Sequence, residues 1–109
     1  MKRGDIVIIA APGDCQKLRP ATVIQSDALS ETGMQSVAVC LMTSSNHKAP
    51  LFRVTIHPTP ENGLTKVTQI MVEKLFSLPG SKISNVIGRL TESELHELNQ
   101  ALTFITGLR

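Results

Sequence analysis

The chain has 109 residues and a formal net charge of +2, with 41% hydrophobic, 18% charged and 3% aromatic residues. This length and hydrophobicity fit a single domain over residues 1–109 with its own core, and they exclude a disordered chain. Three Phe and no Tyr or Trp make a nucleic-acid site built on stacked bases an unfavourable interpretation. We therefore expect a core made of aliphatic side chains.

The charge is unevenly distributed along the chain. Residues 1–90 contain 10 basic and 6 acidic residues, a surplus of +4 (10 minus 6), whereas the last segment holds three glutamates and only Arg109. A positive field over the first part of the chain would favour anionic ligands, although an ordinary solvated surface has a similar composition.

Two cysteines indicate a reducing compartment. Cys15 and Cys40 form no CxxC pair and have no His at a zinc-ligand spacing, which predicts neither a disulfide framework nor a metal site. Cys40 falls within an apolar run and is expected in the core, and Cys15 is expected to be a free thiol in a loop. No leader segment or apolar run of membrane-spanning length is recognisable. We expect a soluble, cytoplasmic protein.

The apolar segments predict mostly short strands. Residues 5–11 read as a strand buried on both faces, and further strands are predicted at 21–26, 35–42 and 51–56, separated by turn-forming segments rich in Pro, Gly, Asn and Ser. Residues 30–34 are predicted as a turn. Residues 65–78 are dense in β-branched side chains and are interpreted as one or two strands, with a helix as the alternative. Residues 86–90 predict a last short strand.

A helix over about residues 92–106 is the clearest predicted element. Thr91 and Glu94 have the spacing of a capping box, and Gly107 is placed to end the helix. An apolar stripe at spacings of three and four would pack on the sheet; it comprises Leu95, Leu98, Leu102 and Ile105. The predicted fold class is mainly β with a C-terminal α-helix: a small barrel or curled sheet with the helix packed on it.

The candidate functional residues are cations and hydroxyls at strand ends. The sequence contains no nucleotide-binding loop or nucleophile elbow, and the spacing of its three histidines fits no metal site. Arg19 precedes Pro20, which favours an extended backbone, and Arg can bind a phosphate with two hydrogen bonds. Thr43 ends the third predicted strand and could donate another. Spacing alone leaves two interpretations open: a phosphodiester site, or a surface cation and a turn residue.

Several motifs occurring in order make the sequence resemble the MazF/PemK (Kid-like) family of toxins of type II toxin–antitoxin systems. The motifs are MKRGDIVII, RPATVIQSD, TSS, LFRV, NGL, TQIMVEKLFSLP and IGRL. The resemblance implies a curled antiparallel sheet of SH3-like barrel type and a homodimer. It also implies a metal-independent, sequence-specific endoribonuclease that cuts single-stranded RNA and inhibits translation. The ribose 2′-hydroxyl would attack the adjacent phosphate, leaving a 2′,3′-cyclic phosphate and a 5′-hydroxyl.

The resemblance also implies site residues and partners. The family's catalytic pair corresponds to Arg19 and Thr43, and no metal or cofactor is implied. Arg does not readily lose its proton, so Arg19 is a poor general base. A cognate antitoxin would lay a disordered acidic segment across the RNA groove, and the complex would bind operator DNA. RNA-binding roles are expected at Gln16, Lys17, Ser44, Ser45, Arg53, Lys66, Thr68 and Gln69. Gln69 matches the family and could either read a base or position the backbone.

This sequence departs from some family members near the site. Some members have an acidic residue where this chain has Thr68, an Arg where it has Lys66, and a His where it offers Gln16 and Lys17. The proton-transfer roles of those members therefore have no counterpart at these positions. Lys17 and Lys66 can supply charge but would act as bases only if strongly desolvated.

Two alternatives share this fold. The first is a gyrase-poisoning toxin of the CcdB type, which relies on aromatic residues at its C-terminus. This chain ends in ITGLR and has no Trp, which argues against that interpretation. The second is a catalytically inactive module that binds nucleic acid or protein, and the extended set of motifs argues against it.

Overall fold

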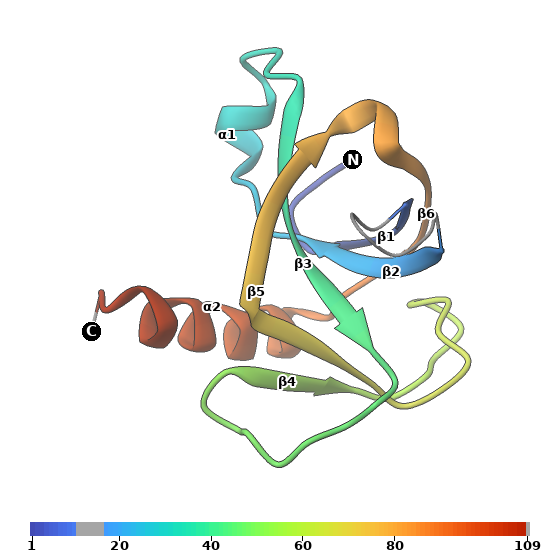
Figure 1. Ribbon diagram of the computed structural model, residues 1–109, viewed down its shortest axis with the longest axis vertical. Coiled ribbons are helices and arrows are strands. Elements are labelled where there is room, and N and C mark those ends of the chain that lie inside the picture. The colour runs from blue at the N-terminus through green and yellow to red at the C-terminus, as the bar shows by residue number, and fades with distance from the viewer. Residues whose placement is uncertain (11–16, 109) are drawn as a thin grey trace.

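A computed structural model describes residues 1–10 and 17–108. Its strands are β1 (Asp5–Ala10), β2 (Leu18–Val23), β3 (Ser36–Thr43), β4 (Arg53–Ile56), β5 (Thr68–Pro79) and β6 (Ile83–Arg89). The helices are α1 (Asp27–Ser30), a 3₁₀ turn η1 (Gly80–Lys82) and α2 (Glu92–Thr106). The strands form one antiparallel sheet in the order β4-β5-β3-β2-β1-β6 (Figure 1). The predicted fold class, a curled antiparallel sheet with a C-terminal helix, is confirmed.

The sheet curls because β5 bends where its pairing with β3 changes register. Between the pairs Met42↔Ile70 and Cys40↔Leu75, β3 advances two residues and β5 advances five. The extra residues of β5 form a bulge, and a bulge bends a strand and increases its twist. Figure 1 shows the first part of β5 beside β4 and its second part running upwards beside β3, with β1, β2 and β6 curled towards it.

The two faces of the curled sheet carry two separate hydrophobic clusters. Side chains of directly paired residues share a face, so Val7, Ala21, Val23 and Val39 lie together in one cluster inside the curl. The opposite face packs under α2, and its buried members are Ile6, Cys40, Met42, Val54, Ile56, Ile70, Val72, Leu90, Leu98 and Ala101. β1 contributes to both clusters, as predicted from its continuous apolar run.

The C-terminal helix forms as its sequence predicts. Thr91 Oγ1 accepts from Glu94 N at 3.1 Å, and Glu94 Oε1 accepts from Thr91 N at 2.8 Å, which completes the capping box. Leu98 is fully buried, and the predicted stripe of Leu95, Leu102 and Ile105 packs partly buried against the same cluster. Gly107 ends the helix in the left-handed conformation, at φ 75°. α2 thereby closes one face of the sheet.

Several predicted boundaries were wrong. β2 begins at Leu18, so Arg19 and Pro20 lie inside the strand rather than before it. Residues 49–52 form a turn in which Arg53 N donates to Ala49 O at 2.8 Å, so β4 starts two residues later than predicted. β5 is one strand, which rules out the helix alternative, and β6 begins three residues earlier than predicted.

The second strand ends at Val23, three residues before its predicted end, and the helix α1 follows at Asp27. Ser26 caps this single turn by accepting from Leu29 N at 3.1 Å. Residues 21–26 were predicted as strand on their β-branched residues, but Gln25 and the cap Ser26 are polar and lie outside β2. The predicted turn at 30–34 follows α1 and contains Gly33 at φ 84°.

The connection between β4 and β5 is held tightly against β6. The Asn62 side chain accepts from Thr59 N and Leu64 N, both at 3.0 Å, and donates to His57 O at 2.8 Å. Gly88 of β6 lies so close to this connection that an added Cβ would be 2.3 Å from the carbonyl carbon of Asn62. The close approach of the two backbones requires glycine there, and it fixes where the connection re-enters the sheet at β5.

We expect Gly88→Ala to lower the free energy of unfolding by about 2 kcal/mol or more, because the new methyl group meets backbone that cannot move aside. Urea denaturation would measure the change. Gly80→Ala is the matched control, since its Cβ would lie 3.4 Å from the nearest atom, Gln35 O. Equal stability losses in the two variants would contradict the packing described here.

Burial makes Cys40 chemically inert. The residue is completely buried, and its burial, followed by the negative charge of Glu73, raises the pKa of the thiol to about 12. Only the thiolate attacks disulfide reagents. In a Cys15→Ser background we expect the folded protein to resist a disulfide reagent at about pH 8, near the pKa of a free thiol. Denatured protein should react with one equivalent, and rapid reaction of the folded protein would be inconsistent with this buried position.

Candidate active site

The candidate site opens where β2 and β3 part. Ile24 N donates to Ala38 O at 3.0 Å, and backbone groups alternate sides along a strand. The backbone nitrogen of residue 20 therefore also points towards β3. An N–H there would donate to the carbonyl oxygen of Met42 and continue the ladder. Pro20 has no N–H, and the observed pairing between β2 and β3 stops at Ala21↔Leu41. The two strands separate beyond this point.

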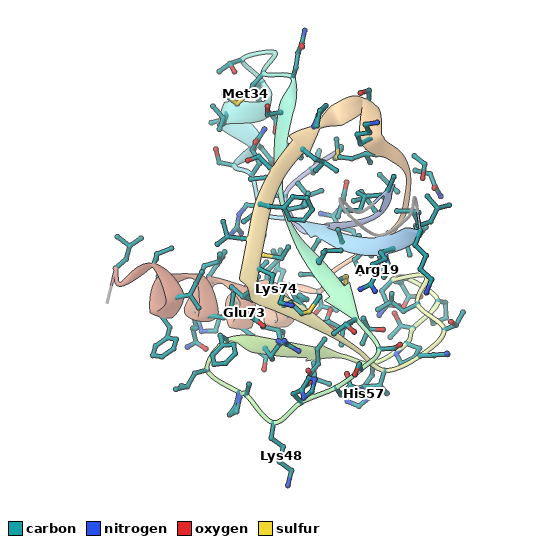
Figure 2. All side chains as sticks on the ribbon, viewed as in Figure 1. Arg19, Met34, Lys48, His57, Glu73 and Lys74 are labelled. Carbon is teal, nitrogen blue, oxygen red and sulfur yellow. The ribbon has the colours of Figure 1, made fainter. Side chains whose placement is uncertain are left out.

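A hollow of about 390 Å³ occupies this gap. Extending the β2–β3 register by two residues places Arg19 opposite Thr43, and both line the hollow. Figure 2 shows Arg19 on β2 beside the end of β3. Three separate parts of the chain contribute, and the lining residues are Lys17, Leu18, Arg19, Pro20, Met42, Thr43, Ser44, Thr65 and Lys66. We call this hollow the Arg19 pocket.

The Thr43 hydroxyl is oriented by its own turn. Thr43 Oγ1 accepts a hydrogen bond from Ser45 N at 3.0 Å. A hydroxyl has one proton and two lone pairs, so acceptance from Ser45 leaves the proton able to donate to a group in the pocket. Arg19 brings a planar guanidinium, which suits an oxyanion bound by two hydrogen bonds. The pocket thus combines a directed hydroxyl with a guanidinium cation.

Electrostatics favours an anion in the Arg19 pocket. Among residues 1–10 and 17–108, the charged residues that line it, Lys17, Arg19 and Lys66, are all basic. Both lysines are solvent-exposed and Arg19 is half-buried. A cleft lined by one sign of charge concentrates field and attracts the opposite charge.

The structure brings together five of the residues proposed from sequence, namely Lys17, Arg19, Thr43, Ser44 and Lys66. Ser45 is exposed and follows the pocket residues directly, with its N–H bound to Thr43. Gln16 lies outside the described residues.

Thr68, Arg53 and Gln69 do not line the Arg19 pocket. Thr68 is only 4% exposed, and its hydroxyl donates to Lys66 O at 2.8 Å, so it fixes the backbone that carries Lys66. Arg53 and Gln69 line a second hollow of about 1080 Å³, between the β3–β4 loop, β4 and α2. Lys48, on this loop, points away from the protein in Figure 2.

An ion pair lies beside the second hollow. Arg53 Nη2 and Nε contact the Glu73 carboxylate at 2.6 and 2.9 Å. Partial burial acts to raise the pKa of Glu73, but hydrogen bonds from Arg53 and the charges of Arg53 and Lys74 outweigh it. The pKa therefore lies below its usual value. Glu73 was not predicted from the sequence, because its partner Arg53 lies 20 residues away and only the pairing of β4 with β5 brings the two together.

Thr65 is a further pocket residue that the sequence analysis passed over. Its position next to Lys66 was the available signal. Within residues 1–10 and 17–108, no cluster of three or more His, Cys, Asp or Glu side chains could hold a metal ion. No helix in the same ranges is long and apolar enough to cross a membrane.

Comparison with known proteins decides the family. Residues 2–106 match the model of the PemK-like, MazF-like toxins of type II toxin–antitoxin systems. The chain belongs to this toxin family. The resemblance predicted from sequence is therefore confirmed over nearly the whole chain.

Relatives agree with this assignment. A Mycolicibacterium smegmatis protein named probable endoribonuclease MazF is 38% identical, covering 99% of this chain and 98% of that protein. The Mycobacterium tuberculosis toxin MazF-mt6 superposes with a TM-score of 0.82 at 19% identity, over 96% of this chain and 98% of that one. A mycobacterial endoribonuclease in complex with its cognate antitoxin gives 0.81 at 17% identity, over 100% and 97%. At these identities the two structures establish a MazF-like fold.

The Arg53–Glu73 pair predicts a defined pH dependence of stability. The folded-state pKa of Glu73 is lowered, so the pair stabilises the protein above the unfolded pKa of about 4.3. That contribution is lost as pH falls through the folded value. We expect Glu73→Gln to lower the free energy of unfolding by about 1 kcal/mol at most at neutral pH, because the pair is partly exposed.

The difference should disappear in acid, when the wild-type carboxyl is protonated. Urea denaturation at several pH values would measure it. Glu31→Gln, on the exposed turn after α1, is the control and should differ little from wild type throughout. A Glu73→Gln deficit that persists unchanged in acid would contradict the assignment.

Proposed function

We propose that this protein is the toxin of a type II toxin–antitoxin system and acts as a metal-independent endoribonuclease on single-stranded RNA. The observation that carries the proposal is the Arg19 pocket, where Arg19 and Thr43 from neighbouring strands face one hollow with Lys17, Ser44 and Lys66. Family membership and the 38% identical relative named probable endoribonuclease MazF support it.

The chemistry follows from what RNA already contains. The 2′-hydroxyl oxygen attacks the adjacent phosphorus, the O2′–P bond forms and the P–O5′ bond breaks. The products are a 2′,3′-cyclic phosphate and a 5′-oxygen that takes up a proton. A substrate that carries its own nucleophile needs mainly correct positioning and stabilisation of charge on the phosphoryl oxygens.

Each pocket residue has a role in this proposal. Arg19 binds the phosphoryl oxygens with two hydrogen bonds, and the Thr43 hydroxyl donates a hydrogen bond to one of them. Lys17 and Lys66 attract the RNA backbone on either side of the scissile phosphate. Arg19 is not assigned as the base, because a guanidinium keeps its proton at the pH of cells.

The same positive pocket would also bind the antitoxin. We propose that an acidic segment of a cognate antitoxin occupies the Arg19 pocket and blocks RNA. A mycobacterial endoribonuclease of similar fold was solved with its cognate antitoxin. A homodimer, a cytoplasmic site of action and binding of operator DNA by the toxin–antitoxin complex belong to the same proposal.

Purified protein incubated with a long single-stranded RNA in EDTA tests the nuclease activity. We expect cleavage at a short sequence with 5′-hydroxyl and 2′,3′-cyclic phosphate ends. Arg19→Ala and Thr43→Val should each reduce the rate constant by about 10²–10³, the effect of losing one preorganised donor to a developing oxyanion.

Conservative variants separate the roles of charge and geometry. Thr43→Ser keeps the hydroxyl and should retain most activity, whereas Arg19→Lys keeps the charge but loses the two-pronged geometry and should remain impaired. Circular dichroism should show that all variants are folded. Intact RNA after incubation with wild-type protein, over a broad range of sequences, would refute the nuclease proposal.

A further inference from the structure

The side chain of Gln69, for which an RNA contact was expected from the sequence, makes its hydrogen bonds within the protein. Its side chain is buried, at 6% exposure for the residue. Gln69 Oε1 accepts from His47 N at 2.9 Å, and Gln69 Nε2 donates to His47 O at 2.8 Å. One amide thus binds both backbone groups of a residue that lies 22 positions away in the sequence.

The remaining hydrogen-bonding positions of this amide are also occupied. Nε2 donates to Thr55 Oγ1 at 3.3 Å, and Oε1 lies 3.5 Å from Arg53 Nη1. A glutamine amide has two donor protons and two acceptor lone pairs, and this structure uses all four within the protein. Gln69 therefore has no edge left with which to read a base.

The position of Gln69 links it to the Arg19 pocket. Gln69 pairs with Thr43 of β3 on one side and with Thr55 of β4 on the other. The loop from β3 to β4 leaves the sheet directly after Thr43. Its first turn is held by the bond from Ser45 N to Thr43 Oγ1 and, two residues later, by the Gln69 contacts to His47.

Ser44, which lines the pocket, lies within the first of these contacts, between Thr43 and Ser45. The Arg53–Glu73 ion pair holds the Arg53 guanidinium next to the side-chain carbonyl oxygen of Gln69. The guanidinium also fixes the orientation of the Gln69 amide, with the oxygen towards Arg53 and the nitrogen towards Thr55.

We propose that Gln69 is a positioning residue that fixes the turn of residues 43–47, and through it the direction of the Thr43 and Ser44 hydroxyls in the Arg19 pocket. The catalytic consequence rests on the proposed nuclease function. The structural part does not, since it concerns the protein without substrate. Gln69 would act on the rate of the chemical step through Thr43, rather than on RNA affinity.

Amide hydrogen exchange on the substrate-free protein tests the structural part. Gln69→Met keeps the side-chain length and removes every hydrogen bond, and Gln69→Glu keeps the acceptor for His47 N but removes the donor to His47 O. We expect the amides of Ser45 and His47, the hydrogen-bonded donors of this turn, to exchange faster by about tenfold or more in both variants, with β3 and β5 unchanged.

Thr55→Val is the matched control, because it removes only the 3.3 Å contact of the same amide, and it should exchange like wild type. Unchanged exchange rates of the Ser45 and His47 amides in Gln69→Met would overturn the proposal.

Cleavage kinetics tests the catalytic part. Gln69→Met should lower kcat by about 10- to 100-fold, since small misplacements of reacting groups carry losses of this size. KM should change by less than about threefold, because the residue holds no RNA.

A double variant then shows how the effect is transmitted. If Gln69 acts through Thr43, adding Gln69→Met to Thr43→Val should cost little further activity. Fully additive losses, or a loss confined to KM, would overturn the positioning role. RNA left intact by the wild-type protein would refute the nuclease function alone, and the exchange experiment would still decide whether Gln69 holds the loop.

Discussion

The missing N–H of Pro20 is the constraint on which the candidate site depends. A donor at this position would continue the ladder between β2 and β3, and the Arg19 and Thr43 side chains would then stand on a closed sheet surface. Because the ladder stops at Ala21↔Leu41, the two strands separate within the sheet. Proline is normally tolerated in a sheet only at edges and bulges. Here it creates a local edge in the middle of the sheet, at the point where an anion can enter.

The rest of the fold fixes both sides of this opening. On the β2 side, β1 pairs with β2 through Arg19 and Leu18 and keeps the strand extended to its end. On the β3 side, Gln69 and Ser45 hold the turn that follows Thr43. The connection before β5 brings Lys66 to the third side, and the Thr68 hydroxyl holds its carbonyl. An open gap with fixed walls suits catalysis by positioning, which requires groups held near their productive geometry.

Local sequence signals predicted much of the fold and less of the site. The capping box at Thr91 and the glycine at 107 predicted α2 closely, because caps act on neighbouring residues. Strands followed from β-branched residues, but β2 was placed late because Pro20 was interpreted as the end of a loop. The pairing of Arg19 with Thr43 came from family resemblance, since spacing alone favoured a surface cation and a turn residue. For Gln69 the sequence left open whether it reads a base or positions the backbone, and its partners could not be predicted, because they are backbone atoms of a loop that only the folded sheet brings near.

The order in which the chain is made gives the discontinuous pocket one more consequence. Lys17, Arg19, Thr43 and Lys66 are synthesised well before β6, which pairs with β1, and before α2, which covers the core. Nascent chains still attached to the ribosome lack the helix that buries one face of the sheet. In a nuclease that attacks messenger RNA, this arrangement would keep the growing polypeptide harmless to the message that encodes it.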